Sequence, residues 1–408
     1  MSHIQNALVA QLREVLTRQR FNPVLVHSYC CNAAHFLEYL ARRKVTLDKV
    51  VPSQVSNYLR YAVRQFCRRR GRPPADQWHS IPRAGIHALL RMVRGKWPPE
   101  SPPANAGEAA CRTVCREYDG YLRDERGLAE ASIDALMWEG RHFLSWYVER
   151  TGAAHFGNLS IKDIDAYFEM RARHLRRRSL KDVAERLRSL ARFLYRSGRI
   201  GDDVAPRIIS PIMYAYEAIP SALTEDQIAS VLKNTRKDRS PLGLRDYAIL
   251  VLLSTYGMRS GEIKRLRIED IDWRAGTLHI RHSKTGVQST LPLVPVVGNA
   301  LLDYLRRGRP KTEVREIFIR ARAPYRSMAY IYSETRRRLE AAGVTPLGKW
   351  GPHAFRHARA VSMLRASVSR KVIGDLLGHR SEEATLPYLK LATKDLRAIG
   401  LEIPEARP

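Results

Sequence analysis

The sequence predicts a mainly α-helical protein with a small β-sheet, in which an α+β domain follows helical modules. Apolar residues recur every three or four positions through most of residues 1–200, as they do on one face of a helix. The alternation of apolar and polar residues that is typical of strands is found in Thr277–His282 and Gln288–Leu293. A chain of 408 residues has room for about two to four domains.

Residues 1–97 are predicted to form an extra helical module at the N-terminus. Its expected helices are Ser28–Leu40, Gln54–Cys67 after Ser53, and Arg83–Val93. Residues 98–108 are rich in proline and small side chains, which indicates a linker.

Residues 109–200 are predicted to form a second helical module. Its expected helices are Ala131–Glu149, Ile161–Arg173 with Ser160 as its N-cap, and Leu180–Tyr195 with Ser179 as its N-cap. Residues 201–222 contain three prolines and are expected to be a second linker.

The two modules contain similar segments. His142–Tyr147 is similar to His35–Leu40, and Leu159–Ile164 is similar to Val51–Val55. These pairs predict an internal repeat of about a hundred residues. Chance similarity between amphipathic helices is the alternative explanation.

Residues 223–408 are predicted to form the α+β domain. A capping box of Thr224 and Gln227 starts its first helix. Glycine is expected to end two of its helices, because glycine adopts the left-handed backbone conformation readily. These helices contain Tyr247–Leu253, which precedes Gly257, and Ser369–Leu377, which precedes Gly378.

The chain is strongly basic. It has 70 Lys and Arg against 41 Asp and Glu, a formal net charge of +29. A long polyanion is the expected partner, because release of its counterions drives binding. No apolar run approaches the ~20 residues of a spanning helix, so double-stranded DNA is favoured over a membrane. The candidates for DNA contact are Arg68, Arg69, Arg70 and Arg72 in the first module and Arg173, Arg176, Arg177 and Arg178 in the second.

The five cysteines all lie in the first 115 residues. Two of them, Cys30 and Cys31, are adjacent, and the total is odd, so a disulfide framework is not expected. The sequence also opens without a signal-peptide pattern. We therefore expect a cytoplasmic protein that associates with the nucleoid.

Polar residues between Arg259 and Tyr388 suit the cleavage of a phosphodiester by a tyrosine nucleophile, without a metal or another cofactor. Two guanidinium groups can clamp the non-bridging oxygens as negative charge develops on them. A lysine in the turn between the two predicted strands can protonate the leaving oxygen. Nearby cations and an imidazole can favour the tyrosine phenolate.

The order of these residues resembles the tyrosine recombinase (phage integrase) family. The motifs are TYGMRSGE, SKTG, HAFRH and LGH, followed by a tyrosine, and the resemblance covers roughly residues 223–396. By position, it implies that Tyr388 is the nucleophile and that Glu262 supports the site. It implies that the activating residues are Arg259, Lys284, His353, Arg356 and His379. A departure from the family pattern is Pro387, which disfavours helix at Leu386.

The resemblance also implies an architecture and an activity. Residues 109–200 would be the core DNA-binding domain, which closes a C-shaped clamp on DNA together with the catalytic domain. The expected function is site-specific recombination through a 3′-phosphotyrosyl intermediate, for integration, excision or transposition of a mobile element. Two subunits would bind each site and four would form the synaptic complex, with accessory proteins as further partners.

Four other interpretations compete with this one. His353 and His357 have the spacing of zinc ligands, but no Glu follows His353 and no cysteine lies near them. The acidic residues Glu269, Asp270 and Asp272 could hold metals, although a turn is the favoured interpretation. The protein could also be a non-catalytic DNA-binding partner in a recombination complex. A type IB topoisomerase that relaxes supercoils would use similar chemistry.

Overall fold

The computed structural model describes residues 3–213, 222–282, 288–346, 348, 350 and 351–378. The described chain is mostly helical and has one three-stranded sheet, which confirms the predicted fold class. It divides into two compact units, Glu100–Ala218 and Met1–Pro99 with Ile219–Pro408. Separate hydrophobic cores lie within residues 12–97, 111–208 and 223–358.

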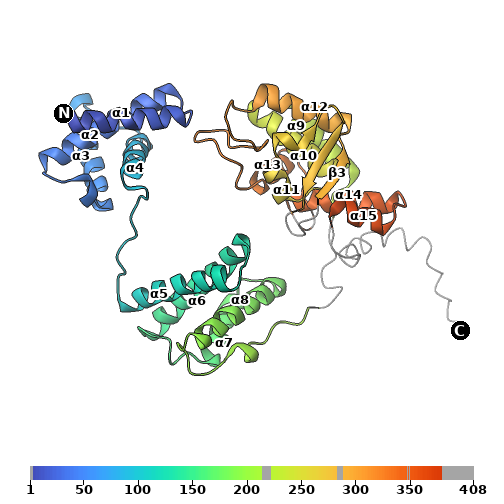
Figure 1. The fold of residues 1–408 in the computed structure, drawn as a ribbon, viewed down its shortest axis with the longest axis horizontal. Coiled ribbons are helices and arrows are strands. Elements are labelled where there is room, and N and C mark those ends of the chain that lie inside the picture. Colours follow the sequence, from blue (N-terminus) through green and yellow to red (C-terminus); the bar gives the residue numbers. More distant parts are fainter. Residues whose placement is uncertain (1–2, 214–221, 283–287, 347, 349, 379–408) are drawn as a thin grey trace, which may run out of the picture. The chain divides into compact units, whose positions relative to one another are not determined.

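In the N-terminal module, residues 3–97 form four α-helices and a short 3₁₀ turn, Leu47–Lys49 (Figure 1). The helices are α1 (His3–Arg18), α2 (Pro23–Arg42), α3 (Pro52–Arg70) and α4 (Ser80–Arg94). Helix α2 packs against α1 and α4, and side chains such as Phe36, Ile86 and Leu89 are fully buried between them.

The three predicted helices of this module, α2, α3 and α4, all begin earlier in the structure than the sequence predicts, and α1 was not predicted. Helix α2 begins at Pro23 because Asn22 Oδ1 accepts a hydrogen bond from the Val24 amide at 2.8 Å. Helix α3 begins at Pro52, where Gln54 Oε1 accepts from the Val51 amide at 2.9 Å, so Ser53 is not its cap. At both starts a proline directly follows the N-cap residue, and the sequence predictions did not use this signal.

The described residues of the second unit also form four α-helices. They are α5 (Ala106–Gly120), α6 (Glu130–Thr151), α7 (Ile161–Ala172) and α8 (Arg177–Arg196), with a π-helical turn at Tyr121–Glu125 and a 3₁₀ turn at Ala205–Arg207. Helix α6 packs against α5, α7 and α8. Ser160 caps α7 as predicted, in a capping box with Asp163.

The structure corrects two expected boundaries in this unit. Helix α5 begins at Ala106, because Asn105 Oδ1 accepts from the Glu108 amide at 2.8 Å. The expected linker 98–108 therefore overlaps its first turn. Helix α8 begins at Arg177, so Ser179 lies inside the helix and does not cap it.

Helices and a small sheet together enclose the third core. The helices are α9 (Glu225–Lys237), α10 (Pro241–Tyr256), α11 (Ser260–Arg265), α12 (Pro295–Asp303), α13 (Tyr332–Ala341), α14 (Pro352–Arg365) and α15 (Arg370–Leu377). Helix α10 lies at the centre, because its residues from Ala248 to Leu253 are all buried. The predicted capping box of Thr224 and Gln227 starts α9.

The sheet is antiparallel, with strands β1 (Ile271–Asp272), β2 (Thr277–Arg281) and β3 (Gln288–Pro292) in that order. Leu278 pairs with Leu291 on the buried face. The predicted pair of strands is thus confirmed. The residues that join β2 to β3, 283–287, lie outside the described residues.

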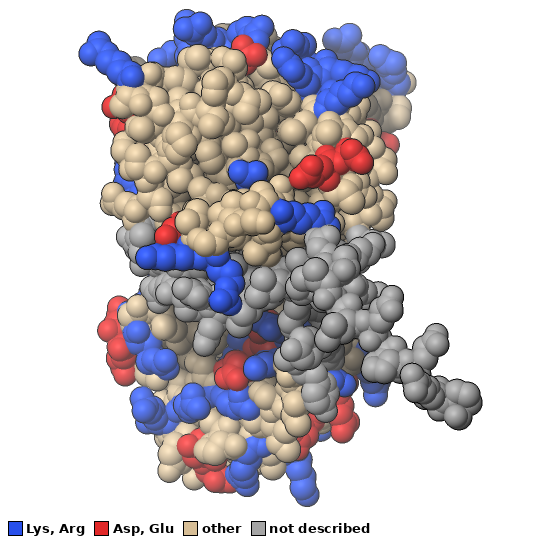
Figure 2. Space-filling view, turned by 90° about the vertical axis from the view of Figure 1, so that its right-hand side faces the viewer, with Lys and Arg blue, Asp and Glu red and all other residues tan. Residues whose placement is uncertain are grey.

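Basic side chains are widespread on the surface. Figure 2 shows one face of the molecule, on which Lys and Arg cover more area than Asp and Glu. Among the described residues, no helix combines the length and the apolar character that crossing a bilayer requires.

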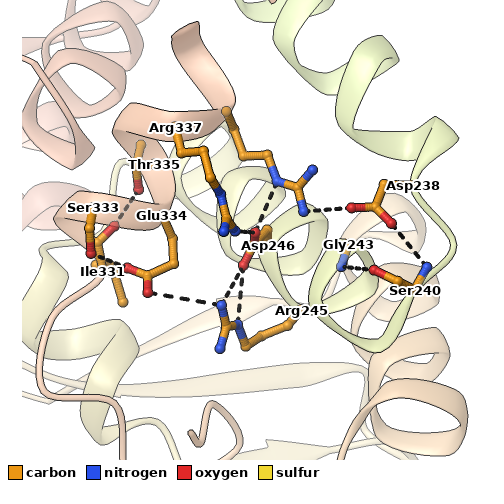
Figure 3. A network of polar contacts seen from close by, with 11 residues as sticks. Asp238, Ser240, Gly243, Arg245, Asp246, Ile331, Ser333, Glu334, Thr335 and Arg337 are labelled. Atoms are coloured by element: carbon orange, nitrogen blue, oxygen red, sulfur yellow. Dashed lines mark hydrogen bonds and ion pairs between the residues drawn. The ribbon is translucent and has the colours of Figure 1, made fainter. Parts of the chain in front are cut away.

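A buried carboxylate joins α10 to α13 (Figure 3). Asp246 is 1% exposed, and it accepts hydrogen bonds from Arg245 at 2.9 Å, Arg337 at 2.7 Å and Arg338 at 2.9 Å. A buried charge is stable only when it is paired in this way. The network therefore fixes α13 against the helix that leads into the candidate site.

Candidate active site

The first functional side chain, Arg259, lies where α10 ends and α11 begins. Gly257 ends α10 with a φ of 64°, which is the left-handed region that glycine adopts readily. Arg259 is the N-cap of α11, and Glu262 lies in the first turn. Glu262 Oε2 accepts the Arg259 amide at 2.7 Å, and Oε1 accepts Arg259 Nη1 at 2.9 Å. The carboxylate thus holds both the backbone and the guanidinium of Arg259.

A buried histidine contacts the same carboxylate. His282 Nδ1 lies 2.9 Å from Glu262 Oε1, and His282 Nε2 lies 2.9 Å from Ser289 Oγ. His282 follows the last residue of β2, and Ser289 is on β3. These contacts connect the strand pair to α11 and therefore to Arg259.

The second arginine, Arg356, comes from the first half of α14. Pro352 is the first residue of that helix, a position that proline favours, and Gly351 precedes it with a φ of 76°. Arg356 is 4% exposed. Its Nη1 donates to the carbonyl oxygen of Gly257 at 2.8 Å, and its Nη2 donates to that of Leu377 at 2.7 Å.

The end of α15 joins the two arginines. Arg259 Nη2 donates to the carbonyl oxygen of Gly378 at 3.0 Å, and Arg356 Nη2 donates to the preceding carbonyl, that of Leu377. The guanidinium groups therefore bind consecutive carbonyls. Gly378 has a φ of 61°, and a Cβ there would lie 2.4 Å from His282 Nδ1. Only glycine fits between α15 and His282.

The electrostatic environment keeps Glu262 ionised. Burial alone would raise the pKa of its carboxyl group. The hydrogen bonds from His282, the Arg259 amide and the Arg259 guanidinium outweigh burial, so that the pKa lies below its usual value. A carboxylate is therefore available to orient both Arg259 and His282.

His353 lies in the first turn of α14, one turn before Arg356, and is exposed. Its ring centre is 6.4 Å from that of His357. Within the described ranges, no group of three or more His, Cys, Asp or Glu could hold a metal ion.

The acidic residues near β1 have other contacts. Asp270 Oδ1 accepts Arg281 Nη2 at 2.9 Å, and Glu269 Oε1 accepts Arg315 Nε at 2.7 Å. Asp272 Oδ1 accepts the amides of Arg274 and Ala275 at 2.9 Å, which makes the predicted turn.

The structure thus brings Arg259, Glu262 and Arg356 together and places His353 one turn away from Arg356. Lys284, His379 and Tyr388 lie outside the described residues. The DNA-contact candidates Arg68, Arg69, Arg70, Arg72, Arg173, Arg176, Arg177 and Arg178 are all exposed.

His282 was not among the predicted site residues, although it stands two positions before Lys284. Its position at the end of an alternating strand was a usable signal. Alternation puts His282 on the same face as Leu278 and Ile280, which are buried. A histidine on a buried face needs a polar partner, but the sequence did not show that Glu262 supplies it.

Comparisons with known proteins show which class this fold and site define. Residues 221–395 match the model of the phage integrase family. A Sinorhizobium fredii protein named as an integrase/recombinase, y4rA, is 34% identical over 79% of this chain and 78% of its own length. Another from the same organism, y4gC, is 61% identical over 46% of this chain and 97% of its own length. Tyrosine recombinase XerC of Mycobacterium sp. (strain JLS) is 26% identical over 70% of this chain and 97% of its own length.

Solved structures agree in fold. A post-cleavage complex of the site-specific recombinase XerH covers 85% of this chain and 93% of that chain, with a TM-score of 0.56 and 16% identity. A lambda integrase dimer on a core site covers 72% of this chain and 99% of that chain, with a TM-score of 0.50 and 20% identity. The chain belongs to the phage integrase family and is a site-specific DNA recombinase of the tyrosine type.

Proposed function

We propose that the chain cuts and rejoins duplex DNA by transesterification at Tyr388. The tyrosine oxygen attacks phosphorus, the bond to the 5′ oxygen breaks, and the DNA 3′ end remains joined to the enzyme as a phosphotyrosine. A 5′ hydroxyl of the partner strand then attacks this linkage and releases the tyrosine. One phosphodiester is exchanged for another, so neither an energy source nor a cofactor is consumed.

The observation that carries this proposal is the convergence of Arg259 and Arg356 on consecutive carbonyls at the end of α15. Two fixed guanidiniums can stabilise the charge that develops on the non-bridging oxygens. They need little reorganisation when the reaction occurs, because Glu262 and the backbone already orient them.

The remaining roles follow from the family pattern. Lys284 supplies the proton for the leaving 5′ oxygen. His353 and His379 assist at the phosphate and favour the Tyr388 phenolate. Arg259 donates a hydrogen bond to the carbonyl oxygen of Gly378, and His379 is the next residue in the sequence.

We assign residues 223–408 to the catalytic domain and residues 109–200 to the core DNA-binding domain, with residues 201–222 as the linker. The two domains close around DNA as a clamp, and Arg173, Arg176, Arg177 and Arg178 contact phosphates. Two subunits bind each site and four form the synaptic complex, consistent with relatives solved as a dimer on a core site and a tetramer on a Holliday junction. Because its substrate is DNA, the protein would act at the nucleoid in the cytoplasm. Its proposed biological role is the movement of a mobile element.

The experiment that tests this function uses a nicked duplex that carries the end sequence of the candidate element. After strand cleavage the short 5′ fragment diffuses away, so the covalent complex accumulates. Wild-type protein is expected to give a denaturant-resistant adduct, and Tyr388→Phe is expected to bind equally and give none. An adduct with Tyr388→Phe would exclude Tyr388 as the nucleophile.

The same protein separates the competing functions. A recombinase exchanges strands between two copies of the site. A type IB topoisomerase relaxes supercoiled DNA that lacks the site, and a non-catalytic partner binds without forming an adduct. The joint presence of Arg259, Glu262 and Arg356 in one hydrogen-bonded site favours catalysis.

A further inference from the structure

The N-terminal module and residues 106–196 each consist of four helices in succession (Figure 1). Helices α1, α2, α3 and α4 correspond to α5, α6, α7 and α8. In each module the second helix packs against the first and the fourth. The segments that are similar in sequence, His35–Leu40 and His142–Tyr147, lie in the corresponding helices α2 and α6. The structure thus supports the internal repeat.

The aromatic cores match in detail. In the first module, the rings of Phe36 and Tyr58 meet edge to face with centres 5.2 Å apart, and Tyr39 meets Tyr58 in the same way at 5.2 Å. In the second, Phe143 and Trp146 each meet Tyr167 edge to face, also with centres 5.2 Å apart. Each central tyrosine lies on the third helix and is at most 4% exposed. A chance similarity of amphipathic helices would not reproduce this geometry.

Two further contacts repeat. The Arg43 guanidinium carbon lies 4.6 Å from the ring centre of Tyr39, and that of Arg150 lies 4.9 Å from the ring centre of Trp146. Arg43 follows Tyr39 by four residues, and Arg150 follows Trp146 by four. The third helices begin alike, with Gln54 and Asp163 each accepting the amide three residues earlier.

Each module also has a cleft at the same place. The first has a volume of about 410 Å³ and the second about 690 Å³. Both are lined by a histidine and an aromatic residue from the second helix and by the central tyrosine of the third. These residues are His35, Tyr39 and Tyr58 in the first cleft and His142, Trp146 and Tyr167 in the second.

The basic runs of the two modules lie in the same region, between the last turns of the third helix and the start of the fourth. We call Arg64, Arg68, Arg69, Arg70 and Arg72 the α3 basic end. All five are exposed, and α3 contains no Asp or Glu. None of the five has an ion-pair partner in the part of the chain that the structure describes. In the second module, Arg173 and Arg176 lie between α7 and α8, Arg178 lies in the first turn of α8, and all three are exposed.

We infer that residues 1–97 are a second copy of the DNA-binding module and that the α3 basic end binds the phosphates of duplex DNA. The inference rests on the proposed function of residues 109–200. Five neighbouring guanidiniums without counterions repel one another, and a polyanion removes this repulsion. Each chain would then hold two stretches of DNA with two related modules, and its footprint would be longer than that of one module and the catalytic domain.

The test measures how binding of the full-length protein depends on salt. The probe is a duplex of about 60 base pairs and arbitrary sequence, about 200 Å long at about 3.4 Å per base pair. The α3 variant is Arg64→Gln/Arg68→Gln/Arg69→Gln. Loss of three phosphate contacts is expected to make the slope of log K against log salt less negative by about 2 to 3, at about 0.9 per contact.

The control variant, Arg13→Gln/Lys44→Gln/Lys49→Gln, removes the same charge from the same module. Lys49 precedes the start of α3, a helix of 19 residues that is about 28 Å long, so it lies far from Arg68. For this control variant, the slope of log K against log salt should differ from that of the wild-type protein by less than about 1. A variant in the second module, Arg173→Gln/Arg176→Gln/Arg178→Gln, should flatten the slope as the α3 variant does.

Each other outcome overturns a specific statement. If the α3 variant matches the control while the second-module variant flattens the slope, the inference is wrong and the proposed function stands. If the α3 variant keeps the slope but loses assembly of subunits in sedimentation, the α3 basic end binds protein and the inference is also wrong. If wild-type protein neither binds the duplex nor forms the Tyr388 adduct, the proposed function itself fails.

Discussion

His282 Nδ1 lies 2.9 Å from Glu262 Oε1, and each side chain is 1% exposed. The same oxygen accepts Arg259 Nη1 at 2.9 Å. One buried carboxylate therefore sets the position of a candidate catalytic arginine and of the residue that follows β2. Any change at Glu262 affects both the stability of the domain and the geometry of Arg259.

Glu262→Gln should destabilise the protein by about 3 to 5 kcal/mol, since breaking a buried ionic contact leaves its partners without compensation. Urea denaturation monitored by circular dichroism measures this loss. The control is Glu269→Gln, which removes an exposed ion pair with Arg315 on the same domain and should cost less than about 1 kcal/mol. Equal losses in the two variants would show that the Glu262 contacts do not stabilise the fold.

The pH dependence of stability should change in the same variant. The pKa of Glu262 is lower in the folded protein than its ordinary value of 4.5. Its contribution to stability is therefore complete above that value and is lost as the pH falls below it through the folded pKa. Wild-type protein should lose stability more steeply than Glu262→Gln below pH 4.5, as shown by urea titrations at several pH values. If stability fell equally with pH in the two proteins, the lowered pKa of Glu262 in the folded state would be contradicted.

Arg356→Ala and Arg259→Ala should each slow cleavage by several orders of magnitude, or about 3 to 4 kcal/mol, as removal of an oxyanion donor does. Affinity for the duplex should fall far less, because many other cations contact the backbone. Single-turnover cleavage of the nicked duplex and filter binding give the two quantities. Arg337→Ala is the control, because Arg337 contacts the buried Asp246 and not the carbonyls at the end of α15. Equal losses of binding and cleavage would make the substituted arginine only an anchor.

Lys284→Ala should cleave ordinary DNA slowly but recover on DNA whose 5′ bridging oxygen is replaced by sulfur. A thiolate leaves without a proton, so a general acid is not needed. The measurement compares adduct formation on the two substrates. Arg356→Ala serves as the reference, since stabilisation of the non-bridging oxygens is still required. If Lys284→Ala does not regain adduct formation on the sulfur-substituted DNA, Lys284 has another role, such as positioning the DNA.

Much of the local structure could be predicted from the sequence. Gly257 and Gly378 end α10 and α15 as expected, because a helix end of this type requires a left-handed residue. Alternation predicted β2 and β3 to within one residue. Helix starts were less predictable. At α2 and α8 the helix begins before the expected position, because a proline after Asn22 and a run of arginines are also compatible with a first turn.

The sequence by itself determined the charge of the chain, the period of its helices and strands, and the order of the motifs that place it in its family. These properties depend on residue type and spacing within one segment. Tertiary structure alone decided that Arg259 and Arg356 bind consecutive carbonyls, that His282 shares the Glu262 carboxylate, and that Tyr58 and Tyr167 occupy equivalent cores. Such contacts join residues far apart in the chain, and their geometry depends on how whole helices pack, which no local pattern specifies.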